Sequence, residues 1–114
     1  MVTFKKGSIV VLPFPFSDLT ATKRRPALVI VDLNGDDYVL CQITSNHMHD
    51  SYEVTLGKND LIKGTLKTDS LVRTNKIFTA TGDIIEYELG ILSEKKMKEV
   101  EEKLIQLIRG KSTQ

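Results

Sequence analysis

The chain has 114 residues, of which 40% are hydrophobic and 27% are charged, and its formal net charge is +1. This length fits one domain over residues 1–114, and this composition is that of an ordinary soluble globule. No apolar stretch approaches the roughly 20 residues of a membrane helix, and the first residues lack the apolar core of a signal peptide. We therefore expect a cytoplasmic protein without a membrane partner, whose attraction to any nucleic acid is local.

The first ninety residues are predicted to form short strands separated by turns. The strands are expected at 8–12, 26–31, 38–43, 52–56, 71–72 with 77–78, 84–85 and 87–92. A turn cluster at 34–37 predicts that 38–43 is the hairpin partner of 26–31, and residues 52–56 alternate between apolar and polar, as in a strand with one wet face. Two prolines, Pro13 and Pro15, are expected to end the first strand because they cannot occupy a central ladder position. Polar loops are expected at 17–24 and 57–64.

The last part of the chain changes to a helical period. Ser93 is a capping residue, and apolar residues then recur at three- and four-residue spacings to about residue 109, with Gly110 at the exit. We expect this amphipathic helix to pack on a small, strongly bent antiparallel sheet that closes into a barrel. Cys41, the single cysteine, lies in an apolar run and is predicted to be a packed side chain.

Three consecutive cations, Lys23, Arg24 and Arg25, precede Pro26 and an apolar strand. A basic loop that enters a buried strand holds its cations at a rigid edge, where they can bind phosphate in a defined place. Such a run alone is usually solvated surface charge. Thr44 with Ser45 at the end of one strand, and Arg73 after another, favour a nucleic-acid site.

The chain resembles the MazF/PemK family of toxin endoribonucleases along nearly its whole length. The resemblance is carried by four segments in the family's order, which are 7–16, 23–30, 43–45 and Gly64 with 70–73. It implies a mainly β fold, an SH3-like small barrel of the MazF/PemK/CcdB-like kind with a C-terminal helix. It also implies a homodimer that cleaves single-stranded RNA, chiefly messenger RNA, at short motifs. A cognate acidic antitoxin would cover the site, and the pair would bind operator DNA.

The resemblance assigns roles to individual residues. The positions that match catalytic residues of the family are Arg25, Thr44 and Arg73. The positions expected to bind RNA are Lys23, Arg24, Ser45, Asn46, His47 and Asn75. RNA carries its own nucleophile, the 2′-hydroxyl, so we expect neither a metal nor another cofactor. Arg25 would hold a phosphate through its planar fork, and Thr44 and Ser45 would add hydroxyl donors.

The proton acceptor for this reaction is not evident from the sequence. Some family members carry an aspartate two residues after the position of Arg73, whereas this chain has Asn75, which cannot accept a proton near neutral pH. Asp69 is close in sequence, but we expect it to cap or turn a loop. Arginine is a poor base because its pKa exceeds about 12, so electrostatic stabilisation is the expected role of Arg25.

The segment 46–50 contains two histidines and an aspartate. His47, His49 and Asp50 could together bind a divalent metal, but the rest of the chain supplies no histidine or cysteine that completes such a set, so we expect no metal site. His47 could instead be a general acid or base, because the ordinary pKa of histidine lies near 6.5. The alternative is a solvated loop that contacts RNA bases or nothing.

Two other functions remain open on the sequence. Gyrase-poisoning toxins share the barrel and bind a protein without cutting RNA, so the fold alone does not decide. Such a binder does not need Arg25, Thr44 and Arg73 together. A module that binds RNA or antitoxin but has lost catalysis is the other alternative, because of Asn75.

Overall fold

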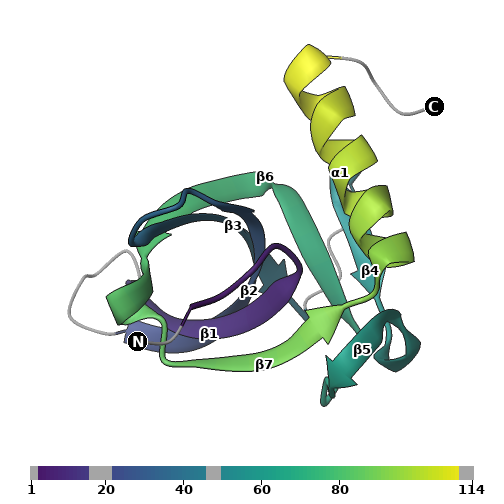
Figure 1. The fold of residues 1–114 in the computed structure, drawn as a ribbon. Coiled ribbons are helices and arrows are strands. Elements are labelled where there is room, and N and C mark those ends of the chain that lie inside the picture. Colours follow the sequence, from purple (N-terminus) through teal and green to yellow (C-terminus); the bar gives the residue numbers. More distant parts are fainter. Residues whose placement is uncertain (1–2, 16–21, 46–49, 111–114) are drawn as a thin grey trace.

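The computed structural model describes residues 3–15, 22–45 and 50–110. Within these ranges the chain forms one curled sheet and one α-helix that rises from its side (Figure 1). The elements are β1 (Ser8–Pro15), β2 (Thr22–Asp32), β3 (Asp37–Thr44), β4 (Glu53–Leu56), η1 (Lys58–Asp60), β5 (Leu61–Gly64), β6 (Ser70–Thr81), η2 (Gly82–Ile84), β7 (Tyr87–Leu92) and α1 (Glu94–Arg109). No helix among the described residues is long and apolar enough to cross a membrane.

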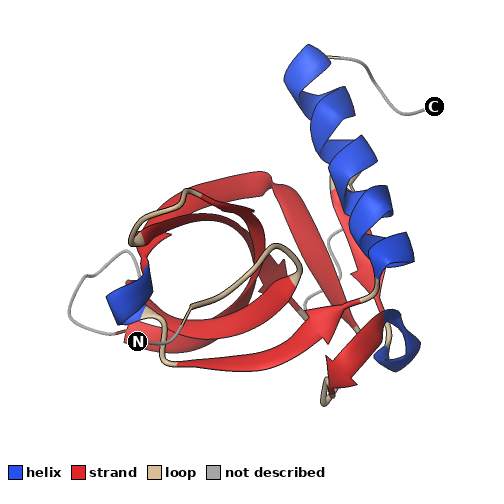
Figure 2. Cartoon of the chain, in the orientation of Figure 1, coloured by secondary structure: helices blue, strands red, loops and turns tan. Residues whose placement is uncertain are grey.

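The seven strands form one antiparallel sheet in the order β4, β6, β3, β2, β1, β7, β5. Strands make up almost all of the curled wall, and α1 lies outside it (Figure 2). The predicted bent antiparallel sheet with a terminal helix is therefore confirmed. The predicted hairpin between β2 and β3 is confirmed as well, with Asn34 in the left-handed conformation in its turn.

Two predicted boundaries near the basic triplet are wrong. β1 does not stop at Leu12 but continues through both prolines to Pro15. Among the described residues, the part of β1 beyond Val11 pairs only with β2, because its ladder with β7 has ended. The missing proline N–H groups can therefore face the side of β1 that has no described partner strand. The triplet was expected in a loop, whereas the structure places it inside β2, which begins at Thr22.

The predicted loop over 57–64 is also wrong in part, because it contains η1 and the short strand β5. Gly64 and Gly90 face each other where β5 crosses β7. A Cβ on Gly64 would lie 2.1 Å from the carbonyl oxygen of Leu89, and Gly64 has a φ of +81°. The close approach of these strands therefore depends on glycine at this position.

The sheet buries apolar side chains on both of its faces. One cluster lies between the sheet and α1 and contains Leu28, Cys41, Met97 and Val100. The other, on what we call the inner face, lies within the curl of the sheet and includes Leu12, Ala27, Val29 and Leu40. Because side chains alternate along a strand, every second residue of β2 and β3 belongs to the inner face.

The helix begins and ends as the sequence predicts. The Ser93 hydroxyl accepts a hydrogen bond from the backbone N–H of Lys96, and Gly110 adopts the left-handed conformation at the C-terminal cap. Met97, Val100 and Leu104 are buried against the sheet. The last turns of α1 extend beyond the barrel wall (Figure 1).

Candidate functional site

Arg25 and Thr44 lie on the inner face, at the end of the sheet where β2 begins and β3 ends. Arg25 pairs with Leu12 of β1, and Thr44 pairs with Leu71 of β6. The β2–β3 ladder pairs Ala27 with Gln42, and the same register continued to the next pair on this face brings Arg25 opposite Thr44. Both side chains are half-buried. The structure therefore places on one face of neighbouring strands a guanidinium and a hydroxyl that lie 19 positions apart in the sequence.

The three cations of the triplet do not act as one cluster. Lys23 and Arg25 belong to the inner face, whereas the alternation of β2 turns Arg24 to the other face. There the guanidinium of Arg24 forms an ion pair with the carboxylate of Glu86. Arg25 is thus the arginine of the triplet that shares the inner face with Thr44.

Arg73 lies next to this pair but is buried, with 4% of its surface exposed. It pairs with Gln42 of β3 on one side and with Glu53 of β4 on the other, which places it on the inner face. Its Nη2 lies 2.9 Å from Oδ2 of Asp50. Oδ1 of Asp50 accepts the backbone N–H of Tyr52, so both carboxylate oxygens of Asp50 are engaged.

Glu53 is a second carboxylate beside Arg73, and the sequence reasoning missed it. It is half-buried, and its Oε2 is buried without a hydrogen-bond partner among the described residues. Nη1 of Arg73 is likewise buried and unpartnered within the same part of the chain. The alternation over 52–56 predicts that Glu53 points to the other face of its strand from Val54 and Leu56. The pairing of β4 with β6, which brings Glu53 next to Arg73, is not visible in the sequence.

The remaining predicted site residues are distributed as follows. Ser45 is exposed directly after β3, near Thr44. Asn75 is exposed in β6, in the irregular stretch where the β3 register jumps from Arg73 to Ile77. Asp69 lies beside Gly57, within 3.9 Å of where a Cβ would stand there. Asn46, His47 and His49 lie outside the described residues.

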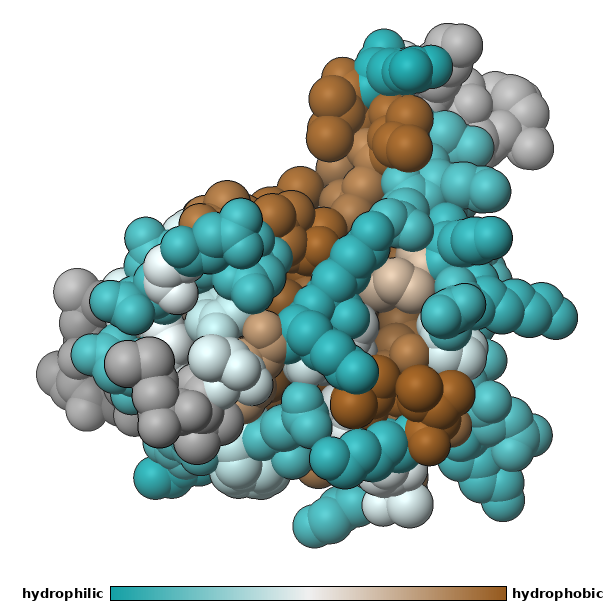
Figure 3. All heavy atoms as spheres, viewed as in Figure 1, coloured by the Kyte–Doolittle hydropathy of each residue, from teal (hydrophilic) through white to brown (hydrophobic). Residues whose placement is uncertain are grey.

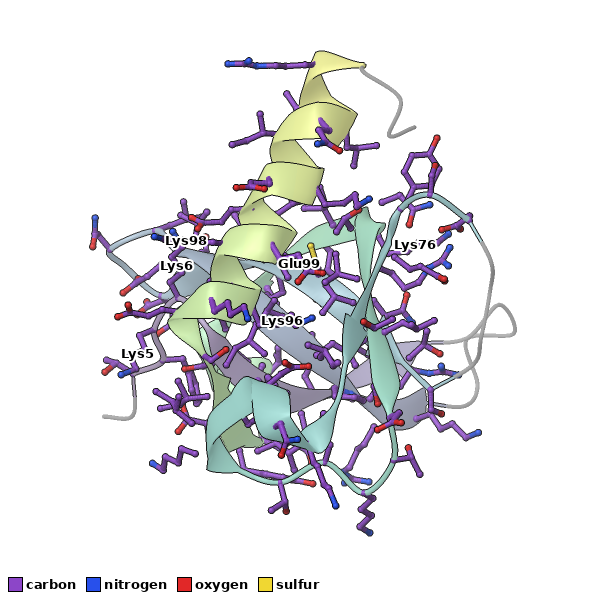
Figure 4. All side chains as sticks on the ribbon, turned by 90° about the vertical axis from the view of Figure 1, so that its right-hand side faces the viewer. Lys5, Lys6, Lys76, Lys96, Lys98 and Glu99 are labelled. Carbon is purple, nitrogen blue, oxygen red and sulfur yellow. The ribbon has the colours of Figure 1, made fainter. Side chains whose placement is uncertain are left out.

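Other lysines are spread over the surface of the molecule (Figure 4). Lys5, Lys6 and Lys98 lie on one side of the molecule and Lys76 on the other (Figure 4). Several of the helix-side lysines are paired. Lys6 contacts Glu101, and Lys96 lies near Asp60 and Glu99. We read these lysines as solvated surface charge.

Two further features lie outside the site. A cavity of about 700 Å³ is lined by Phe4, Asp36, Tyr38 and neighbouring residues, at the opposite end of β3 from Thr44. Burial raises the pKa of the Cys41 thiol to about 12, so this buried cysteine stays protonated, in agreement with its predicted packing role. Among the described residues no group of three histidine, cysteine or acidic side chains is placed to hold a metal ion.

A family model described as PemK-like, MazF-like toxin of type II toxin-antitoxin system matches residues 5–108. The chain belongs to this toxin family. The match covers the whole sheet and nearly all of α1, so the PemK/MazF assignment applies to the fold as well as to the motif around Arg25. No curated protein matches the chain.

Solved structures agree with the PemK/MazF fold. A mycobacterial endoribonuclease in complex with its cognate antitoxin superposes with a TM-score of 0.76 at 15% identity, over 94% of this chain and 96% of that one. MazF from a MazE-MazF structure of Deinococcus radiodurans superposes at 0.75 with 23% identity, over 97% and 100%. The Mycobacterium tuberculosis toxin MazF-mt6 gives 0.69 at 18% identity, over 93% and 99%. At these identities the likeness supports the fold.

Proposed function

We propose that the protein is the toxin of a type II toxin-antitoxin pair and a sequence-specific endoribonuclease that cleaves single-stranded RNA, chiefly messenger RNA. The observation that carries this proposal is the meeting of Arg25 and Thr44 at one end of the inner face, in a chain of the PemK/MazF family. Similar structures include an endoribonuclease bound to its cognate antitoxin. We expect an acidic antitoxin to cover the same end of the sheet, and the pair to bind operator DNA.

The proposed reaction uses the chemistry of RNA itself. The 2′-hydroxyl attacks the adjacent phosphorus, the bond to the 5′-oxygen breaks, and the products are a 2′,3′-cyclic phosphate and a 5′-hydroxyl. The planar fork of Arg25 stabilises the charge that develops on the phosphorane oxygens, and the Thr44 hydroxyl donates a further hydrogen bond. Arg73 adds positive charge at the base of the site. Lys23, Ser45, Asn46, His47 and Asn75 would contact the RNA around it, and Arg24 would contact it from the rim.

Excess chelator is expected to leave this cleavage unchanged. The nucleophile belongs to the RNA and the charge is stabilised by arginine, so a metal has no required role. The measurement is cleavage of a messenger RNA transcript with and without EDTA, with the ends identified by their susceptibility to phosphatase and kinase. A DNA copy of the transcript is the control and should remain intact. Loss of cutting in EDTA with rescue by magnesium would contradict the mechanism.

We further propose that the active species is a homodimer. Ile105 and Ile108, on the part of α1 that extends past the barrel, expose 49% and 77% of their surface. Val31, Leu33 and Ile77 of the neighbouring wall are also exposed. In Figure 3 the apolar surface runs from the end of α1 onto the adjoining barrel. A two-fold axis beside α1 would bury both apolar areas, which water disfavours.

Substituting aspartate for Ile108 should therefore convert the dimer to a monomer. The substitution puts a charge into the proposed apolar interface, while an exposed position at the end of a helix does not disturb the fold. Sedimentation velocity at micromolar concentration measures the change. Lys98→Asp, also exposed on α1, is the matched control and should sediment as the wild type does. A monomeric wild type at concentrations that cut RNA would refute the dimer.

A further inference from the structure

The proposed reaction needs a group that accepts the proton of the 2′-hydroxyl, and Asn75 cannot do so. In the described part of the chain, three acidic residues near Arg73 in sequence or space are available, namely Asp50, Glu53 and Asp69. Asp50 is committed, because its two oxygens bind Arg73 and the Tyr52 backbone. Asp69 lies beside Gly57, which follows β4 at the end remote from Glu53.

Glu53 differs from both carboxylates in having an uncommitted oxygen. Its Oε2 is buried and makes no hydrogen bond with any described residue, which is unusual because a buried carboxylate oxygen without a partner is costly. A catalytic role is one explanation for a buried polar group that a fold leaves unpaired. Arg73, whose Nη1 is likewise buried and unpartnered among the described residues, is the residue opposite Glu53 on the neighbouring strand.

The register places Glu53 on the same face as the proposed phosphate-binding residues. Glu53 pairs with Arg73, which pairs with Gln42, and Thr44 is the next residue of β3 on that face. At a strand spacing of about 4.8 Å, β4 lies roughly 10 Å from β3 along the sheet, and the curl of the sheet brings inner-face side chains closer.

We propose that Glu53 is the general base of the nuclease site. In this step the carboxylate of the half-buried Glu53 takes the proton of the 2′-hydroxyl as the bond from the 2′-oxygen to phosphorus forms. The bond from phosphorus to the 5′-oxygen breaks, and that oxygen takes a proton from water. Glu53 then returns its proton to the solvent. The charged groups that face Glu53 are Arg73 from β6 and Asp50 from the segment before β4, while β3 contributes the uncharged Gln42.

The test rests on the proposed function and begins with a short RNA around a cut site mapped with the wild-type protein. Single-turnover rates are measured across pH for wild type, Glu53→Gln, Asp50→Asn, His47→Ala and Glu99→Gln. Glu53→Gln keeps the shape of the side chain but cannot take a proton, so its rate should fall about 10²-fold and its acidic pH limb should disappear. It should bind the same RNA, carrying a 2′-deoxy group at the cut site, at least as tightly as wild type.

The other variants separate catalysis from structure. Glu99→Gln is the matched control, because Glu99 lies exposed on α1 (Figure 4), and it should match the wild type in rate and pH profile. Asp50→Asn removes the other carboxylate beside Arg73, and it should be slowed but keep the acidic limb. The assignment would be overturned if Glu53→Gln cleaved RNA within threefold of the wild-type rate or kept the acidic limb of the pH profile. It would also be overturned if His47→Ala lost that limb instead. Absence of RNA cleavage by the wild type would overturn the proposed function itself.

Discussion

Replacement of Arg25 by alanine is expected to slow single-turnover RNA cleavage by about 10²- to 10³-fold, the loss found when a preorganised donor to a developing oxyanion is removed. The position of Arg25 on the inner face beside Thr44 is the physical reason, because a half-buried guanidinium interacts more strongly with developing charge than an exposed one. Binding of an RNA with a 2′-deoxy cut site should weaken much less than the rate. The measurement is the rate at saturating enzyme.

Two further variants make this prediction specific. Arg25→Lys should restore little of the rate, because an ammonium keeps the charge but loses the two parallel hydrogen bonds of the fork. Arg24→Ala is the matched control, because Arg24 lies on the other face of β2 and is paired with Glu86. Its cleavage rate should fall less than tenfold, and its affinity for RNA should change more than its rate. Near-wild-type cleavage by a folded Arg25→Ala variant would remove the basis of the site assignment.

Replacement of Leu28 by alanine is expected to lower the free energy of unfolding by about 2–5 kcal/mol. Leu28 is fully buried in β2 and belongs to the cluster that joins the sheet to α1, so truncation leaves a cavity between two layers. A domain of this size has about 5–15 kcal/mol of stability in total, so the loss is a large share. Urea unfolding followed by circular dichroism measures it. Ile62→Ala, at an exposed position of β5, should change the midpoint little, and equal losses in both variants would show that burial of Leu28 is not the cause.

Much of the fold could be predicted because the chain is locally regular. The alternation of 52–56, the turn at Asn34 and the capped helix each follow from a short pattern, and the structure confirms them. The extension of β1 to Pro15 could not be predicted, since it depends on β7 ending its ladder at Val11. β5 was missed because its pairing depends on the facing glycines, Gly64 and Gly90.

The candidate site could likewise be predicted from the sequence only in part. Arg25 and Thr44 could be selected from the sequence because each lies in a motif that resembles the family. The separation of Arg24 from Arg25 requires knowing that the triplet lies within a strand, where neighbours point to opposite faces. The Asp50 ion pair and the position of Glu53 depend on how β4 pairs with β6, a long-range register that no local pattern encodes.

The outermost strands of the sheet, β4 and β5, are only four residues long, and the open edge of β1 beyond Val11 carries two prolines. The unpaired backbone groups of an open strand edge can form hydrogen bonds with a strand of another molecule, which leads to aggregation. Short edge strands and prolines in an edge oppose this pairing. A toxin that is separated from its antitoxin must stay dispersed on its own. These blunted edges would keep the released chain from aggregating, and so leave it available both to act and to be neutralised again.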